Sequence, residues 1–172
     1  MHKNLYLNQK FTKFINNENF EFDRSKILKI LNSDLLEDAY KTISKWQKYQ
    51  PTPLESLNKL SNELKLKNIF YKDESKRFGL KSFKALGGAY AVEKITKGKK
   101  DVIVSTATAG NHGKSVAWGA KNLGLNCKIF ISENVSETRA EEMRNLNAEV
   151  IRVKGNYEDS LSFCKEESKK NN

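Results

Sequence analysis

The spacing of apolar residues divides the N-terminal part of the chain into segments of different character. Residues 1–24 show no clear period and are expected to form an irregular arm. Between Ser25 and Tyr49 apolar side chains recur at helical spacing, which predicts one or two helices. Pro51 and Pro53 end that stretch, because proline disfavours helix at its own position and at the residue before it. A further amphipathic helix is predicted from Leu54, Leu57, Leu60 and Leu64.

Beyond residue 67 strand-like and helix-like segments alternate with short links. Strands are predicted at 68–72, 102–106, 127–132 and 150–153, and helices at 82–96, 111–123, 136–146 and 157–169. Asn156 is the expected N-cap of the last helix. Alternation of this kind is typical of crossover units, which build a mainly parallel sheet with helices on both faces. The fold class is therefore α/β, with an N-terminal arm and helices over 1–50 and an α/β region over 51–172.

Composition and charge narrow the class of protein. The 172 residues are enough for one ordinary domain, and they contain no apolar run long enough to span a membrane and no export signal, so a cytoplasmic protein is expected. Cys127 and Cys164 have no CxxC spacing and are expected to be reduced, and two histidines exclude a histidine-rich metal cluster. The net charge of +10 comes from lysines scattered among asparagines and glutamates. We therefore expect it to attract an anionic cofactor or substrate rather than nucleic acid.

The stretch RFGLKSFKALGG at 77–88 contains the strongest candidate for chemistry. A lysine held at a helix start, facing a site and shielded from bulk water, can form a Schiff base with a carbonyl cofactor. Lys84 is the candidate, although a lysine on an amphipathic helix is more often on a solvated face. Gly87 and Gly88 lie inside the predicted helix, where each costs about 1 kcal/mol relative to alanine. Such glycines indicate close packing or a bound ligand.

A second candidate is the turn TATAGNHG at 106–113, between a predicted strand and the helix after it. Ligands of parallel sheets gather at the carboxyl ends of strands, where helix N-termini offer free N–H groups. Asn111 adds an amide that can donate to a phenolic oxygen, but it could equally be only a helix cap. His112 could be a base, and we favour a ring packed beside the site. Asp73, Glu74 and Arg77 are expected to form an ion-pair network that fixes the loop.

Together these motifs resemble the pyridoxal-phosphate (PLP) enzymes of fold type II. The resemblance rests on PTPL at 51–54, KDES at 72–75, RFGLKSFKALGG at 77–88, TATAGNHG at 106–113 and GNYEDSL at 155–161, and it covers about residues 40–170. Within that group the chain is most similar to the diaminopropionate ammonia-lyases. The shorter motifs are shared with threonine dehydratases and threonine synthases, whereas the stretches around 77–88 and 136–159 are more specific.

The resemblance implies a cofactor, a reaction and residue roles. Lys84 would carry PLP as a Schiff base and, once released, would take the proton from the substrate Cα. Asn111 would contact the phenolic oxygen of PLP, and Phe83 would pack against its ring. The substrate would be the small amino acid 2,3-diaminopropionate, and α,β-elimination would give pyruvate and ammonia. The complete enzyme would be a homodimer.

Two departures from the family pattern modify these expectations. Ala109 stands where the lyases usually have an aspartate thought to move a proton and to help accept the D-isomer, so activity on D-diaminopropionate is not expected, and a threonine or serine dehydratase-like reaction is an alternative. The family's glycine-rich phosphate loop and its partner for the pyridine nitrogen lie beyond residue 172. The chain is therefore expected to be an incomplete piece of the fold, either completed by a C-terminal chain or non-catalytic.

Overall fold

The computed structural model describes residues 23–170 of the chain, which forms two compact units that divide between Leu36 and Glu37. Helix α1 (Arg24–Ile30) begins after Asp23, whose Oδ1 accepts hydrogen bonds from the backbone N–H groups of Ser25 and Lys26. Helix α2 (Ser33–Ile43) follows, and the Oδ1 of Asn32 accepts from the Leu35 N–H. One or two helices were predicted in this stretch, and the structure has two, whereas the predicted arm lies almost wholly outside the described residues.

A short antiparallel pair surrounds the next helix. Strand β1 (Leu54–Ser56) pairs with β2 (Phe70–Lys72), and α3 (Asn58–Glu63) lies between them in the sequence. The strand at 68–72 is thus confirmed over its last residues. The predicted helix is wrong at Leu54, because backbone pairing with β2 holds that residue extended and overrides the leucine spacing.

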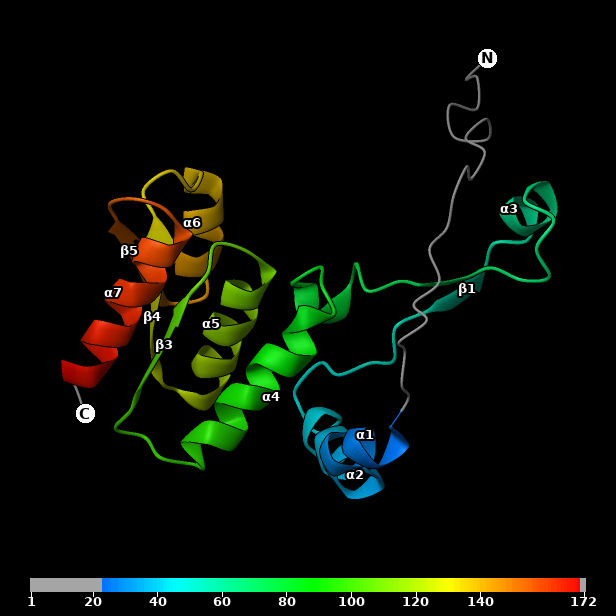
Figure 1. Ribbon diagram of the computed structural model, residues 1–172, viewed down its shortest axis with the longest axis horizontal. Coiled ribbons are helices and arrows are strands. Elements are labelled where there is room, and N and C mark those ends of the chain that lie inside the picture. Colours follow the sequence, from blue (N-terminus) through cyan, green and yellow to red (C-terminus); the bar gives the residue numbers. More distant parts are fainter. Residues whose placement is uncertain (1–22, 171–172) are drawn as a thin grey trace, which may run out of the picture. The chain divides into compact units, whose positions relative to one another are not determined.

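The main sheet is parallel and has the order β3-β4-β5 (Figure 1). Its strands are β3 (Ile103–Ala107), β4 (Asn126–Ser132) and β5 (Ala148–Val153). Helices α5 (Asn111–Leu123) and α6 (Glu137–Arg144) cover one face, and α7 (Tyr157–Lys170) covers the other. The α/β class and the strand and helix predictions from residue 82 onward are confirmed to within a few residues.

The core of this layer follows the two-residue period of β4. Ile129 and Ile131 are buried against α5 and α6, whereas Phe130 is buried on the opposite face with Cys164 of α7. The last helix begins as predicted, because the Asn156 Oδ1 accepts hydrogen bonds from the N–H groups of Glu158 and Asp159. Alternate residues of β4 therefore pack against the helices on opposite faces of the sheet.

Helix α4 (Lys84–Thr96) packs on α5 through small residues. A Cβ on Gly88 would lie far inside van der Waals contact with the Ser115 Oγ, and a Cβ on Gly119 would lie 2.8 Å from the Ala89 Cα. The Ser115 hydroxyl also donates to the Ala85 carbonyl. Residue 85 thus lies beside 115 and residue 89 beside 119, so the two helices run parallel and begin at the same end.

That contact explains one of the two helical glycines. Gly88 permits the close approach to α5, as its presence inside a helix indicates. A Cβ on Gly87 would meet no atom within 4 Å among residues 23–170, so packing against these residues does not account for this glycine.

Candidate functional site

The candidate site lies where α4 and α5 begin, at the carboxyl end of β3. The strand ends at Ala107, and the Thr108 N–H still donates to the Phe130 carbonyl across the sheet. Asn111 is the first residue of α5, and Lys84 is the first residue of α4. Because these helices are parallel and packed together, Lys84 and Asn111 belong to the same end of the helix pair. The carboxyl ends of parallel strands are where such folds bind ligands.

Lys84 presents an unpartnered amine at this end. Its Nζ makes no hydrogen bond or ion pair with any residue in the described range 23–170, and its side chain is exposed. The expectation that Lys84 is shielded from bulk water is therefore wrong for this structure. Lys84 is the first residue of α4, so no earlier turn of the helix covers its side chain. Phe83, just before it, is 64% exposed.

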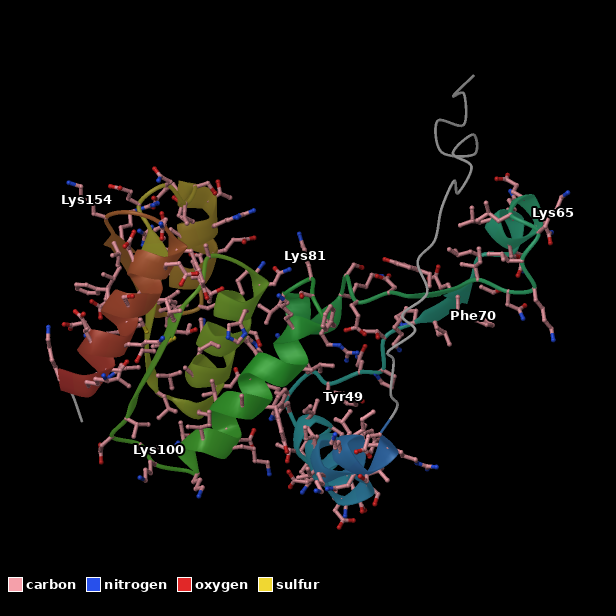
Figure 2. All side chains as sticks on the ribbon, in the orientation of Figure 1. Tyr49, Lys65, Phe70, Lys81, Lys100 and Lys154 are labelled. Carbon is pink, nitrogen blue, oxygen red and sulfur yellow. The ribbon has the colours of Figure 1, made fainter. Side chains whose placement is uncertain are left out.

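The turn before α4 has an unusual backbone and a firm anchor. Phe78, Gly79 and Lys81 all have left-handed φ angles of 49–74°; Lys81 is labelled in Figure 2. Arg77, which is 6% exposed, anchors the turn. Its Nε donates to the Glu74 Oε2 at 2.8 Å, its Nη1 to the Gln50 carbonyl at 2.8 Å and its Nη2 to the Thr52 Oγ1 at 3.0 Å. These hydrogen bonds from Arg77 fix the turn that leads to Lys84.

The ion pair between Glu74 and Arg77 also shifts the pKa of both side chains. Hydrogen bonding and charge from Arg77 lower the pKa of Glu74 below its usual value, and Glu74 in turn raises the pKa of Arg77. The predicted ion-pair network is confirmed for these two residues. Asp73 does not join it, because its Oδ1 instead accepts from the Ser75 N–H at 2.9 Å.

An aromatic cluster ties the same turn to α5, and sequence reasoning missed it. The rings of Phe78 and Trp118 stack with centroids 4.5 Å apart, and Trp46 meets Trp118 edge-on at 5.5 Å. The indole N–H of Trp46 donates to the Glu93 Oε2 of α4 at 2.7 Å. These contacts join positions far apart in the sequence, and only the run of aromatic residues flanking the proline segment could have suggested them.

The start of α5 is open to a ligand. Gly110 is the N-cap and supplies no side-chain hydrogen bond, so the first N–H groups of the helix have no side-chain partner there. A Cβ on Gly113 would lie 2.8 Å from the Met143 Sδ, which explains why a residue without a side chain stands there. Asn111 is exposed, as a ligand-binding amide must be before its ligand arrives.

Two neighbours of Asn111 have different surroundings. His112 is exposed and lies on the rim of a cleft beside Gly88, so its ring is not packed as we favoured. Ala109 is partly buried and packs against the apolar core beneath α5. Within residues 23–170 there is no group of His, Cys, Asp and Glu that could hold a metal ion.

Comparison with known proteins identifies the family. The family model described as "Pyridoxal-phosphate dependent enzyme" matches residues 45–172. The chain belongs to this family. It is 39% identical to the diaminopropionate ammonia-lyase of Escherichia coli K12 over 131 residues, which is 66% of this chain and 33% of that protein. It is 36% identical to the biosynthetic L-threonine dehydratase of Haemophilus influenzae over 124 residues, or 72% of this chain and 24% of that one.

Solved structures give the same result. The apo form of E. coli diaminopropionate ammonia lyase matches with a TM-score of 0.76 and 34% identity, over 81% of this chain and 43% of that one. The fold is that of the type II PLP enzymes, and the resemblance to the ammonia-lyases is confirmed over their N-terminal part. The chain spans about a third of the length of the E. coli enzyme in the sequence comparison.

The geometry at the helix starts fits the cofactor of this family, pyridoxal phosphate. An unpartnered primary amine at Lys84 suits an aldehyde, and the free N–H groups at the start of α5 suit anionic oxygens. The exposed Phe83 ring offers an apolar surface for a planar ring.

No helix in the described part of the chain is both long and apolar enough to cross a membrane.

Proposed function

We propose that this chain provides the lysine-bearing part of a PLP-dependent ammonia-lyase that releases ammonia and pyruvate from 2,3-diaminopropionate. The observation that carries the proposal is the arrangement of Lys84 and Asn111 as the first residues of two parallel, closely packed helices. Similarity to the ammonia-lyases of E. coli and Salmonella typhimurium, at 39% and 36% identity, supports this substrate class.

Each residue at the helix starts has a role in the proposal. The Lys84 Nζ holds the cofactor and, once displaced by substrate, accepts the proton from the substrate Cα. The Asn111 side-chain amide donates to the phenolic oxygen of the cofactor, and Phe83 covers its ring. The N–H groups at the start of α5 hold anionic oxygens. When bound, PLP supplies the electron sink for the carbanion at Cα.

Fixing the lysine is the task of the turn before α4. The Arg77 fork and the Phe78–Trp118 stack hold this turn against residue 50 and against α5. Lys84 therefore starts from a defined backbone position, and its flexible side chain supplies the reach. Positioning of this kind lowers the entropy cost of reaction.

Ala109 sets the expected stereochemistry. A methyl group packed against the core cannot donate or accept a proton. We therefore propose that the L-isomer is the substrate, since proton transfer then depends on Lys84 alone. The same alanine, together with the 36% identity to a threonine dehydratase, favours dehydration of threonine or serine as the second candidate.

The lysine assignment is tested by trapping. The 172-residue chain is mixed with PLP and reduced with borohydride, and mass spectrometry locates the modified lysine. We expect modification at Lys84, and loss of both the Schiff-base absorbance and the adduct in Lys84→Ala. Lys81→Ala is the matched control, because Lys81 is exposed in the same turn and is expected to leave the adduct unchanged. An adduct that persists in Lys84→Ala would show that the assignment is wrong.

The reaction is tested separately, with the C-terminal part of the E. coli ammonia-lyase supplied to the chain. We propose that such a complementary part, and a dimer of the completed enzyme, are needed for turnover. Pyruvate released from L-2,3-diaminopropionate, but not from threonine or serine, is the expected result. Release of a keto acid from threonine or serine alone would favour the dehydratase reaction. If Lys84 is trapped by PLP but none of these substrates gives a product, both the ammonia-lyase and the dehydratase reactions are ruled out.

A further inference from the structure

A cavity of about 330 Å³ lies beside the contact between α4 and α5, away from the helix starts. Ala89 and Gly119, which touch where the two helices pack, both line it, and they are too small to fill it. Residues 45–47, which follow α2, form another part of the lining. Glu93 also lines the cavity, nine residues after Lys84 in α4. At 1.5 Å per residue this is roughly 13 Å along the helix, so the cavity is separate from the candidate site.

Glu93 brings to this cavity a partly buried carboxylate that has no cationic partner among residues 23–170. Its Oε2 accepts a hydrogen bond from the Trp46 indole N–H at 2.7 Å, and its Oε1 receives none from the described residues. The neighbouring Lys94 is paired instead with Asp38, at 2.7 Å. A carboxylate partly withdrawn from water is stabilised when a cation lies beside it. Glu93 is therefore suited to a positively charged group of a ligand.

Two indole rings add a second feature that favours a cation. Trp46 and Trp118 line the cavity with their ring centroids 5.5 Å apart, in an edge-to-face arrangement. Indole rings attract ammonium groups through cation–π interactions, and apolar side chains pack against them. Glu93 and Asn122 lie in the last turns of α4 and α5, where the helix dipole also favours positive charge. The cavity thus combines a carboxylate, aromatic walls and the negative ends of two helices.

Lys45 supplies the opposite charge at the same cavity. It is exposed, and its amine makes no ion pair or hydrogen bond with any residue in the range 23–170, Glu93 included. A lysine and a carboxylate that line one cavity without pairing can each bind one end of a ligand that carries both charges. A volume of about 330 Å³ is at the lower end of the range for ligand pockets, so the ligand is a small molecule.

We propose that this cavity binds a free α-amino acid with an apolar side chain, at a site separate from the start of α4. The ammonium group of the ligand pairs with the Glu93 carboxylate, its carboxylate pairs with the Lys45 amine, and its side chain packs against Trp46 and Trp118. Because Trp118 also stacks on Phe78, the bound ligand stabilises the aromatic cluster that holds the turn before α4. This inference is independent of the reaction proposed above.

The chain carries its own probe, because Trp46 and Trp118 are its two tryptophans and both line the cavity. The 172-residue chain is titrated with L-leucine while its intrinsic fluorescence is followed, and a saturable change is expected. Isoamylamine lacks the carboxylate and 4-methylpentanoate lacks the amine. Each should bind about tenfold more weakly, because it leaves one charge of the cavity unpaired. No saturable change with leucine, or equal affinity for either analogue, would overturn the proposal.

Variants place the ligand in the cavity. Glu93→Gln keeps an oxygen for the Trp46 N–H but removes the charge, so the affinity for leucine should fall about tenfold. Glu141→Gln, at an exposed carboxylate on α6, should leave it unchanged. Lys45→Met should weaken the binding of leucine but not that of isoamylamine.

Lys84→Ala separates this site from the proposed cofactor site. The affinity for leucine should be unchanged in this variant, whereas trapping of PLP is lost. A loss of leucine binding in Lys84→Ala, or equal losses in Glu93→Gln and Glu141→Gln, would contradict the location. The comparison of leucine with its two analogues uses the wild-type chain alone, so it decides the proposal even if a variant does not fold.

Discussion

The parallel sheet β3–β5 and the antiparallel pair β1–β2 use the same backbone hydrogen bonding to different effect. In β4, Ile129, Phe130 and Ile131 are all at most 1% exposed, whereas every residue of β1 and β2 is exposed. The sheet has helices over both faces, and within the described residues the pair has none. Strand pairing satisfies backbone groups, but removal of side chains from water requires a second layer. Burial, rather than pairing, thus separates the two regions.

The largest expected effect comes from the same substitution made in both regions. Phe130→Ala empties a fully buried position in β4 and should lower the free energy of unfolding by about 4 kcal/mol. Phe70→Ala, at a ring 61% exposed in β2 (Figure 2), should change it by less than about 0.5 kcal/mol. Urea unfolding followed by circular dichroism measures both. Similar losses would mean that β2 is covered as well as β4 is.

The Arg77 anchor comes next, because it ties the chain on both sides of β1 and β2 to the start of α4. Arg77→Ala leaves the largely buried Glu74 carboxylate without its cation, and we expect a loss of about 3 kcal/mol. Lys76→Ala, at the exposed neighbouring residue, should change stability by less than about 0.5 kcal/mol. Thermal unfolding compares the two, and a small effect in Arg77→Ala would show that the anchor is dispensable.

A smaller effect separates the two helical glycines on α4. Gly88→Ala forces a methyl group into the Ser115 hydroxyl and should cost about 2 kcal/mol. Gly87→Ala places its methyl group in open space and should stabilise the chain by up to about 1 kcal/mol through helix propensity. The opposite signs are the expected result in urea unfolding. A loss at Gly87 would point to a contact outside the described residues.

The smallest effect is a pH dependence of the buried layer. Burial raises the pKa of the Cys127 thiol from 9.0 to about 12. Above pH 9 the unfolded chain loses this proton while the folded chain keeps it, so stability falls as pH rises from 9 towards 12. At pH 10 the loss from this group should be about 1.4 kcal/mol relative to pH 7.

The pH effect is isolated by comparing wild type with Cys127→Ala over pH 7–10. The variant is less stable throughout because of its cavity, but its stability should decline less between pH 9 and 10. Parallel curves would show that Cys127 does not cause the decline. Cys164 is a weaker second source, since burial raises its pKa as well.

Much of the fold could be predicted because local pattern and tertiary structure agree from residue 82 onward. The helix Asn111–Leu123 matches the prediction at both ends, since Gly110 and Gly124 mark its limits. Prediction failed at Leu54, where pairing with β2 overrides the leucine spacing. It failed again at Asp73, which caps a turn beside the ion pair that Glu74 and Arg77 form. Leu54 pairs with a residue that is distant in the sequence, and Asp73 and Glu74 are adjacent carboxylates. Sequence spacing therefore did not identify the partner in either case.

Prediction of the site was limited in the same way. Motifs pointed to Lys84, Asn111 and Phe83, and these assignments remain predictions until trapping tests them. The aromatic cluster of Trp46, Phe78 and Trp118 was missed, because residues 32 or more positions apart leave no local signal of contact. The sequence left Lys84 open between a shielded site and a solvated helix face, since solvent access depends on which other segments surround the helix start.

The sequence by itself determined the family, the α/β class and the start of α5 at Asn111. These follow from motifs and periodicity, which are local and need no knowledge of distant neighbours. Tertiary structure decided that α4 and α5 run parallel and bring Lys84 and Asn111 to one end, through the Gly88–Ser115 and Gly119–Ala89 contacts. Contact and burial depend on two segments that pack together, whereas a sequence pattern describes only one of the two.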